Sequence, residues 1–378
     1  MSESMTTQRR NIRWEMMATV SALALCTAVY DAGQAQAADG NADRPTLWIE
    51  LGAQSEQVSG FGDPLDVSFA PKVVSDGFTS PLGLQRALSQ SFGGESTISF
   101  QPENSNWIFS ASILYGRAGG HKATHEQTPG GSRHITIATP GGNHSGTGQL
   151  NFTRFSETRV SNSETHVVLD FQAGKDIGLG LFNGRGESIV NFGVRFAQFT
   201  SKQVLGMNAD PDFYLPKPLT VENAKYHHTY AVASHMERSF RGLGPSVSWN
   251  ASAPAVGNAD NGEVALDWGV NASVLFGRQK VTGHHQTVAT LFKSNELRKY
   301  HFTSHFQRSG SPDRARTVVV PNLGGFAGVS YAFPNAKLSL GYRADLFFGT
   351  MDGGIDTAKR ENVGFYGPFA SVSVGVGG

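Results

Sequence analysis

The chain has 378 residues with 31 basic and 31 acidic side chains, and this balance gives no reason to expect a nucleic-acid partner. Its length accommodates two ordinary domains or one large all-β unit. Glycine accounts for 45 of the 378 residues, about 12% against a usual ~7%, which favours a chain rich in strands and turns.

The first 37 residues have the layout of a secretory signal peptide. Arg9, Arg10 and Arg13 form a basic region, and an apolar stretch runs from 16 to 30. The A-x-A sequence at 35–37 is a typical cleavage site. We therefore expect residues 1–37 to be removed during export and residues 38–378 to form the mature protein.

The only cysteine, Cys26, lies within this signal and follows Leu25, where a lipoprotein signal has a small residue. We therefore expect no lipid anchor, and a mature chain without disulfides or thiolate sites. After the signal, no run of 18 apolar residues occurs, which excludes a helical membrane protein.

Apolar and polar residues alternate along several segments of the chain. In 338–349, Leu340, Tyr342 and Leu346 share one face of a strand, because successive side chains point to opposite sides. Arg343 and Asp345 share the other face. In chain order, the segments predicted as strands are 46–54, 94–101, 107–116, 166–174, 189–197, 240–253, 264–276, 320–333, 338–349 and 363–376.

Short and long connections alternate strictly between these segments. The short ones are 102–105, 175–187, 254–262 and 334–336, and the long ones are about 55–93, 118–163, 201–239, 278–319 and 350–362. Outer-membrane barrels have short periplasmic turns and long extracellular loops. We therefore predict a closed antiparallel transmembrane β-barrel of about ten strands, with eight or twelve as alternatives. A soluble β-sandwich would give the same facial pattern, but fits the export signal and the loop lengths less well.

In a barrel, the polar faces of the strands line the lumen. A polar lumen predicts a narrow, porin-like pore for small hydrophilic solutes or ions. The alternatives are a salt-bridged, filled interior that makes a plugged structural barrel and, less favoured, an outer-membrane hydrolase of the omptin kind. The predicted lumen residues are Asp170, Gln172, Asn191, Arg195, Asp267, Asn271, Arg343 and Asp345.

Four stretches resemble the Legionella-type major outer membrane protein family. They are VVLDFQAG (167–174), VNFGVRFAQF (190–199), RSFRGLGP (238–245) and LGYRADLFFG (340–349). The resemblance implies an integral, pore-forming outer-membrane barrel and carries over no catalytic residue. The sequence ends in SVSVGVGG, without the terminal aromatic residue usual in such barrels.

The twelve histidines lie between 121 and 305, mostly in the expected loops. The neighbouring pairs His227–His228 and His284–His285 would point apart on a strand, which speaks against a metal site. Neither G-x-S-x-G nor H-E-x-x-H occurs, so we expect no enzyme, metal or cofactor. The expected partners are outer-membrane lipid, lipopolysaccharide, small solutes and the barrel assembly machinery.

Overall fold

The computed structural model is all-β in the part of the chain that it describes. The expected signal peptide, 1–37, lies outside the described residues. Among the described residues, no helix is long and apolar enough to cross a membrane. The described ranges are 47–60, 90–102, 105–127, 131–139, 142–152, 155–177, 186–214, 225–258, 262–296, 299–355 and 357–376.

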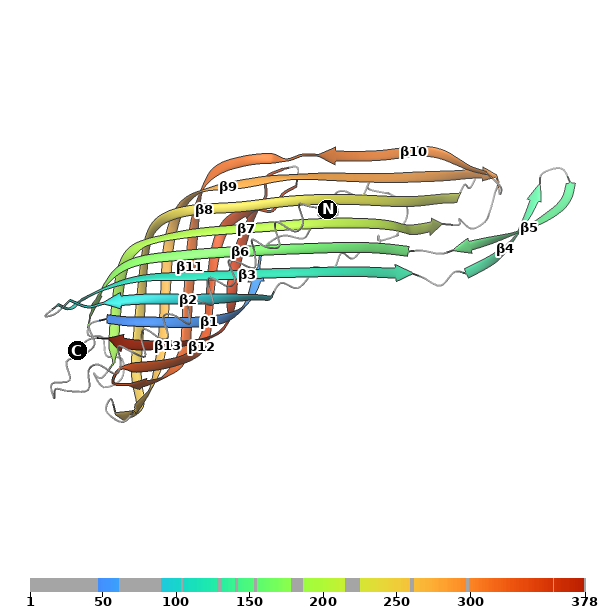
Figure 1. Ribbon diagram of the computed structural model, residues 1–378. Helices are drawn as coiled ribbons and strands as arrows, with labels where there is room; N and C mark the ends of the chain where they lie inside the picture. Colours follow the sequence, from blue (N-terminus) through green and yellow to red (C-terminus); the bar gives the residue numbers. More distant parts are fainter. Residues whose placement is uncertain are drawn as a thin grey trace, which may run out of the picture.

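The strands of the described residues follow one another with short and long connections between them (Figure 1). They are β1 (Leu47–Ser59), β2 (Gln90–Phe100), β3 (Trp107–Gln127), β4 (Gly131–Thr139), β5 (Gly142–Phe152), β6 (Phe155–Asp176), β7 (Glu187–Tyr214), β8 (Lys225–Asn258), β9 (Gly262–Glu296), β10 (Lys299–Gly310), β11 (Asp313–Phe333), β12 (Ala336–Asp352) and β13 (Arg360–Val376).

Ten of these strands close into one antiparallel barrel. Going round the barrel, the order is β1, β2, β3, β6, β7, β8, β9, β11, β12 and β13, and β13 pairs with β1. The strand β10 pairs with β9 alone, and β4 and β5 form a separate hairpin. The predicted fold, a closed antiparallel barrel of ten strands, is confirmed. Closure leaves no unpaired edge in the ring, as a barrel inside a lipid bilayer requires.

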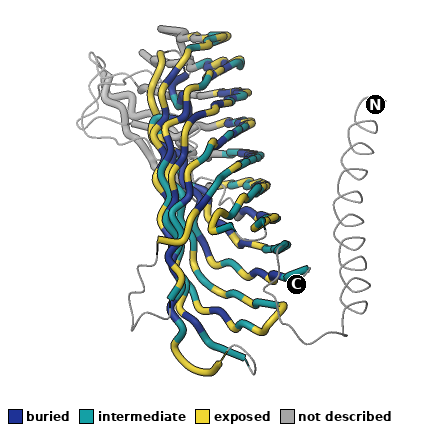
Figure 2. Tube along the Cα trace, turned by 90° about the vertical axis from the view of Figure 1, so that its left-hand side faces the viewer, coloured by how far each residue is buried: buried dark blue, intermediate teal, exposed yellow. Residues whose placement is uncertain are grey.

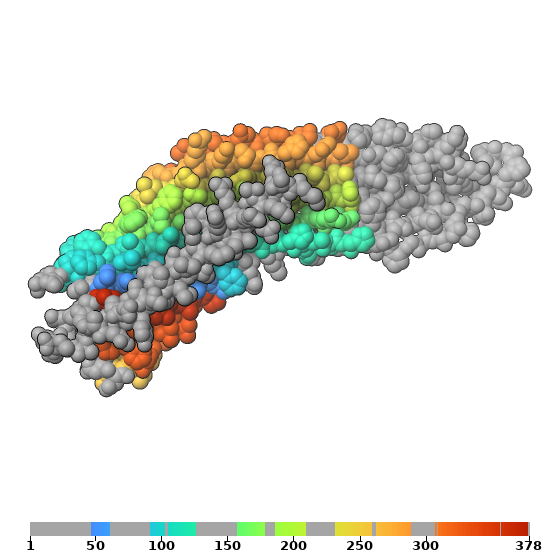
Figure 3. All heavy atoms as spheres, viewed as in Figure 1, coloured from blue at the N-terminus to red at the C-terminus, as the bar shows by residue number. Residues whose placement is uncertain are grey.

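The barrel wall is apolar outside and polar inside. On β12, Leu340 and Tyr342 point outward with 57% and 52% of their surface exposed, while Arg343 and Asp345 line the interior. Exposed and buried residues alternate in this way along the strands (Figure 2). In the space-filling view, neighbouring strands of the ring follow one another as adjoining coloured bands of the outer wall (Figure 3).

The outward-facing apolar residues include aromatic rings at both ends of the barrel wall. Near the short turns these are Phe100, Trp107, Tyr331 and Phe333, and the rings of Tyr331 and Phe333 meet edge to face with centroids 4.6 Å apart. Toward the long connections, the exposed rings are Phe92, Tyr115, Phe276 and Phe348. An apolar band between two aromatic girdles is the surface of an outer-membrane type of barrel.

The structure corrects the prediction of long loops at 118–163, 201–239 and 278–319. Strands β3, β6, β7, β8 and β9 continue through much of these segments, and β8 and β9 have 34 and 35 residues. The continued strands form a sheet that extends from one side of the barrel (Figure 1). We call this part, residues 118–127, 155–165, 201–214, 225–239 and 278–296, the sheet extension.

The sheet extension was missed because its alternation is weak. One face carries buried residues at every second position, such as Val160, Leu205, Met207 and Val232. Short polar side chains, among them Ser201 and Ser234, occupy other positions of this buried face. A period-two pattern predicts a strand only where apolar residues dominate one face, so a mixed face resembles a loop.

Candidate functional site: the barrel lumen

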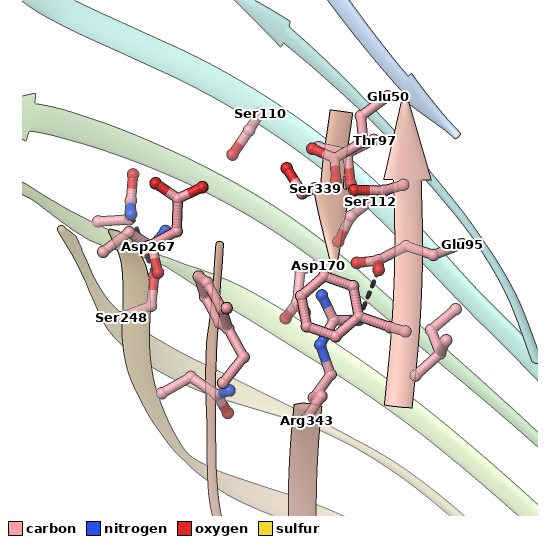
Figure 4. A pocket seen from close by; sticks show the side chains of 18 of the residues that line it. Glu50, Glu95, Thr97, Ser110, Ser112, Asp170, Ser248, Asp267, Ser339 and Arg343 are labelled. Atoms are coloured by element: carbon pink, nitrogen blue, oxygen red, sulfur yellow. Dashed lines mark hydrogen bonds and ion pairs between the residues drawn. The ribbon is translucent and has the colours of Figure 1, made fainter. Parts of the chain in front are cut away.

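The lumen contains a cavity of about 380 Å³ at the short-turn end of the barrel. Its wall is built from strand ends beside the short turns, among them Glu50, Thr97, Ser110 and Ser339 (Figure 4). We call this cavity the cup. All eight residues predicted from the sequence for the lumen line it: Asp170, Gln172, Asn191, Arg195, Asp267, Asn271, Arg343 and Asp345.

Several ion pairs stand on the wall of the cup. The guanidinium of Arg343 on β12 pairs with the carboxylate of Glu95 on β2, as the dashed line in Figure 4 marks. The same guanidinium lies 5.2 Å from the ring centre of Phe369, within the range of a cation–π contact. Lys337 Nζ lies 2.8 Å from Asp267 Oδ2, and the Ser252 hydroxyl donates to the other oxygen of Asp267 at 2.6 Å.

Arg195 of β7 organises the deeper wall of the cup. Its Nε and one terminal nitrogen donate to both carboxylate oxygens of Asp170 on β6, at 2.7 and 2.8 Å. Its other terminal nitrogen donates to Asn271 Oδ1 at 2.7 Å and to the side-chain oxygen of Asn322. The carboxylate of Asp345 lies 3.9 Å from that nitrogen. A two-pronged arginine–carboxylate pair fixes geometry as well as charge, so Arg195 crosslinks several strands through the lumen.

The two remaining predicted residues belong to a neutral network. Asn191 Nδ2 donates to the Ser248 hydroxyl at 3.1 Å, and that hydroxyl lies 3.1 Å from Gln172 Oε1, to which it donates. These partners lie on β6, β7 and β8, which are neighbours in the ring. Every predicted lumen residue therefore has a polar partner across or along the wall.

An apolar layer crosses the lumen directly beyond the cup. It contains the rings of Phe199, Phe240, Phe347 and Phe365, all 3% exposed or less. The Phe199 ring meets the Phe347 ring at 4.7 Å and the Phe365 ring at 5.4 Å between centroids. Leu275, Val320 and Val363 are buried in the same cluster. We call this the aromatic layer, and it separates the cup from the long-connection end.

A second polar zone lies beyond the aromatic layer. His166 Nε2 lies 3.2 Å from Glu56 Oε2, and both side chains are nearly inaccessible to solvent. The His166 ring also lies against Phe365, with centroids 3.9 Å apart. The pair therefore lies on the far side of the aromatic layer from the cup.

The connection between β12 and β13 turns into this end of the barrel. Arg314 of β11 donates to the carbonyls of Ile355 at 2.6 Å and Gly354 at 2.8 Å, and its Nε lies 3.3 Å from Asp352. Arg238 of β8 lies 3.4 Å from the carbonyl of Gly353. Burial lowers the pKa of Arg238, whereas the negative charges of Glu361 and Asp352 act in the opposite direction. Met351 and Ile355 are buried here, so the connection packs into this end of the barrel.

No group of three or more potential metal ligands is present in the described part of the chain. Of the histidine pair at 284–285, His284 is exposed and lies 3.0 Å from the Ser311 hydroxyl, whereas His285 is buried. The two rings thus lie on opposite faces of β9.

Several lumen residues were not predicted from the sequence. Glu95 lies on the same face of its strand as Thr97 and Ser99, so the period-two alternation of this strand would have placed it in the lumen. The aromatic layer could also have been predicted from the sequence, because Phe347 and Leu275 fall on the otherwise polar, lumen-facing sides of their strands. Apolar residues at both faces of two strands indicate an apolar layer inside the barrel.

Comparisons with known proteins identify no family for this chain. No family model matches it, and no curated protein matches it. Among solved structures, the beta domain of the Bordetella autotransporter Brka aligns with 88% of this chain and 100% of its own, at 9% identity and a TM-score of 0.20. A mutant of the TodX monoaromatic hydrocarbon channel aligns with 86% of this chain and 88% of its own, at 11% identity and a TM-score of 0.16. Structural similarities this weak do not bear on the function of this chain.

Proposed function

We propose that this protein is an integral outer-membrane β-barrel with its long connections at the cell surface. The support is the apolar outer wall, on which residues such as Leu243, Phe276 and Leu340 are more than half exposed. A continuous apolar wall of this kind is unfavourable in water and matches a lipid environment. The proposal includes export by the 1–37 signal and insertion by the barrel assembly machinery. The resemblance to the Legionella-type family stays a prediction.

Within the membrane, we infer that the barrel is closed and serves as the anchor of the sheet extension. The observation that carries this is the aromatic layer, in which Phe199 and Phe347 are 0% and 1% exposed. Water and ions cannot pass a layer of packed rings that leaves no accessible surface. The network around Arg195 and the inward-turned connection at 352–355 support the same conclusion, because both tie strands together through the lumen.

The second candidate is a porin-like narrow pore for small hydrophilic solutes. The cup favours it, because a polar cavity of about 380 Å³ extends from the short-turn end up to the aromatic layer. Conduction would require the Phe347 and Phe365 rings to move aside. The two candidates therefore differ in one property, the opening of the aromatic layer.

We propose no enzymatic activity. The omptin-like alternative needs a histidine and carboxylates that reach a substrate at the rim of the barrel. Among the described residues of the lumen face, the histidine His166 is 2% exposed and stays in contact with Glu56. A protease assay on refolded protein tests this directly, and cleavage of a peptide library would overturn it.

Single-channel recording of the refolded mature protein in planar bilayers tests the closed barrel. We expect insertion, measured separately by protection from protease in vesicles, without stepwise conductance. Stable conductance steps of uniform size in the wild-type protein would favour the porin-like pore instead. A failure to insert would contradict both candidates and the membrane location itself.

A further inference from the structure

Two arginines stand directly opposite each other on the outer wall, at the edge of its apolar band. Arg241 of β8 and Arg278 of β9 are register partners and both are exposed. They point outward, because their chain neighbours Phe240 and Gln279 are buried on the opposite, inward face of the two strands. Side chains opposite each other in an antiparallel pair have Cβ atoms about 4.5–5.5 Å apart, and like charges there are destabilising.

Lys280 adds a third positive charge to this pair. It lies two residues beyond Arg278 on β9, on the same face, and is also exposed. Its register partners are Ser239 and Ala315, and the second partner of Arg278 is Thr317, so none of these neighbours is acidic. We call Arg241, Arg278 and Lys280 the basic cluster.

No carboxylate of the described residues forms an ion pair with the basic cluster; the exposed Asp313 of β11 lies opposite Thr282, two residues beyond Lys280. Arg241 donates through Nε to the side-chain oxygen of Gln198 at 3.1 Å, which is a neutral partner. The acidic outward residue of this part of β8 is Glu237, which lies 3.3 Å from Lys202 Nζ on β7. Three neighbouring cations on one face without an ion-paired carboxylate form a site for a ligand with more than one negative charge.

The residues on the membrane side of the cluster are apolar. Leu243 and Phe276 are register partners two residues from the arginine pair, and both point outward with more than half of their surface exposed. A ligand bound to the arginines would therefore have an apolar surface directly below it. A phosphorylated lipid has this arrangement of charge above acyl chains, whereas free phosphate would use the cations alone.

We propose that the basic cluster binds the phosphate groups of a phosphorylated glycolipid of the outer leaflet, of the lipid A type. Guanidinium groups bind phosphate through two parallel hydrogen bonds, and two phosphates match the two opposed arginines with Lys280 beside them. The acyl chains then lie against Leu243 and Phe276. The assignment of this end to the outer leaflet rests on the orientation given under the proposed function.

The test measures lipid binding to the refolded mature protein in detergent micelles by native mass spectrometry. The probes are diphosphorylated lipid A, dephosphorylated lipid A, phosphatidylglycerol and inorganic phosphate. We expect diphosphorylated lipid A to bind at least tenfold more tightly than the other two lipids. The Arg241→Gln, Arg278→Gln double variant should lose this tenfold preference. The matched control is Lys359→Gln, which removes an exposed cation of the β12–β13 connection, away from Glu237, and should keep the preference.

A second readout is the stability of the same proteins. Without lipid, Arg278→Gln should unfold at a higher denaturant concentration than wild type, because it removes the repulsion from Arg241. With diphosphorylated lipid A, the order should reverse. Equal binding by wild type and double variant, equal binding of dephosphorylated lipid A, or displacement of lipid A by inorganic phosphate would overturn the proposal. Wild-type protein that fails to fold in micelles would contradict the membrane barrel; a folded barrel without lipid preference would contradict the lipid site alone.

Discussion

Arg343 and Asp345 are two residues apart on β12, yet they take partners in opposite directions around the barrel. Arg343 pairs with Glu95 on β2, whereas the carboxylate of Asp345 lies 3.9 Å from Arg195 on β7. The two charges on one strand face are thus not a local pair. They connect β12 to strands on either side of it through the lumen, which makes the interior a crosslinked structure.

A reversal of charge at Arg343 tests this crosslink. In Arg343→Glu, two carboxylates face each other at the Glu95 site, and breaking a largely buried pair of this kind costs about 3 kcal/mol. The measurement is a denaturant titration of the refolded protein in detergent. The exchange variant, Glu95→Arg with Arg343→Glu, should recover most of the loss. If the exchange variant loses as much stability as the two single variants together, Glu95 and Arg343 do not stabilise each other.

The aromatic layer is tested by removing its rings. Phe347→Ala should lower the free energy of unfolding by about 3–5 kcal/mol, because it deletes a buried ring and leaves a cavity. The double variant Phe199→Ala, Phe347→Ala should give conductance steps in planar bilayers where the wild type gives none. The control is Phe348→Ala, the next residue, which faces outward and should leave the lumen closed. Silent recordings from the double variant would mean that another element, such as the connection at 352–355, closes the lumen by itself.

Neighbouring residues on β3 test which face meets lipid. Ile113 points outward and Ser112 lines the cup, so only Ile113→Arg places a charge in the apolar band. Near the bilayer midplane such a charge costs about 2–4 kcal/mol. Ser112→Arg should cost much less, because its register partner Asp170 is acidic. Unfolding titrations that give equal losses for the two variants would contradict the assignment of the faces.

Two glycines of neighbouring strands test the packing around His166. A Cβ atom at Gly116 would overlap the His166 ring, whereas a Cβ at Gly94 meets no atom within 4 Å. Gly116→Ala should therefore cost about 1–3 kcal/mol. Gly94→Ala should be neutral or stabilising by about 0.4–1 kcal/mol, since alanine restricts the unfolded chain. Adding His166→Ala to Gly116→Ala should remove most of the clash, and an unchanged loss would mean that the ring is not its cause.

The class of the protein has a direct test. The refolded mature chain should give a β-type circular dichroism spectrum and should migrate differently in detergent gels before and after boiling. The reason is the closed ring of ten strands, which leaves no edge at which unfolding can begin. A helical spectrum, or recovery of the protein in a soluble fraction without detergent, would contradict the membrane barrel.

The faces of the barrel strands follow from the sequence alone, whereas the number of strands, predicted as about ten with eight or twelve as alternatives, was settled at ten by the pairing in the ring. Period-two alternation is a local property, so Leu340 and Arg343 could be assigned to opposite faces without knowledge of the partner strands. The alternation of long and short connections then implied antiparallel neighbours and hence a barrel. All eight polar residues assigned to the lumen from this pattern line the cup.

The tertiary structure alone decided what fills the lumen and how far the strands extend. Whether Phe347, Phe199 and Phe365 meet in one layer depends on the stagger of β12, β7 and β13 around the ring, which no local pattern encodes. The same stagger places Arg195 beside Asn271 and Asn322, far away in the chain. The sheet extension likewise depends on pairing between neighbouring strands, because its mixed polar faces resemble loops until each strand is seen beside its partner.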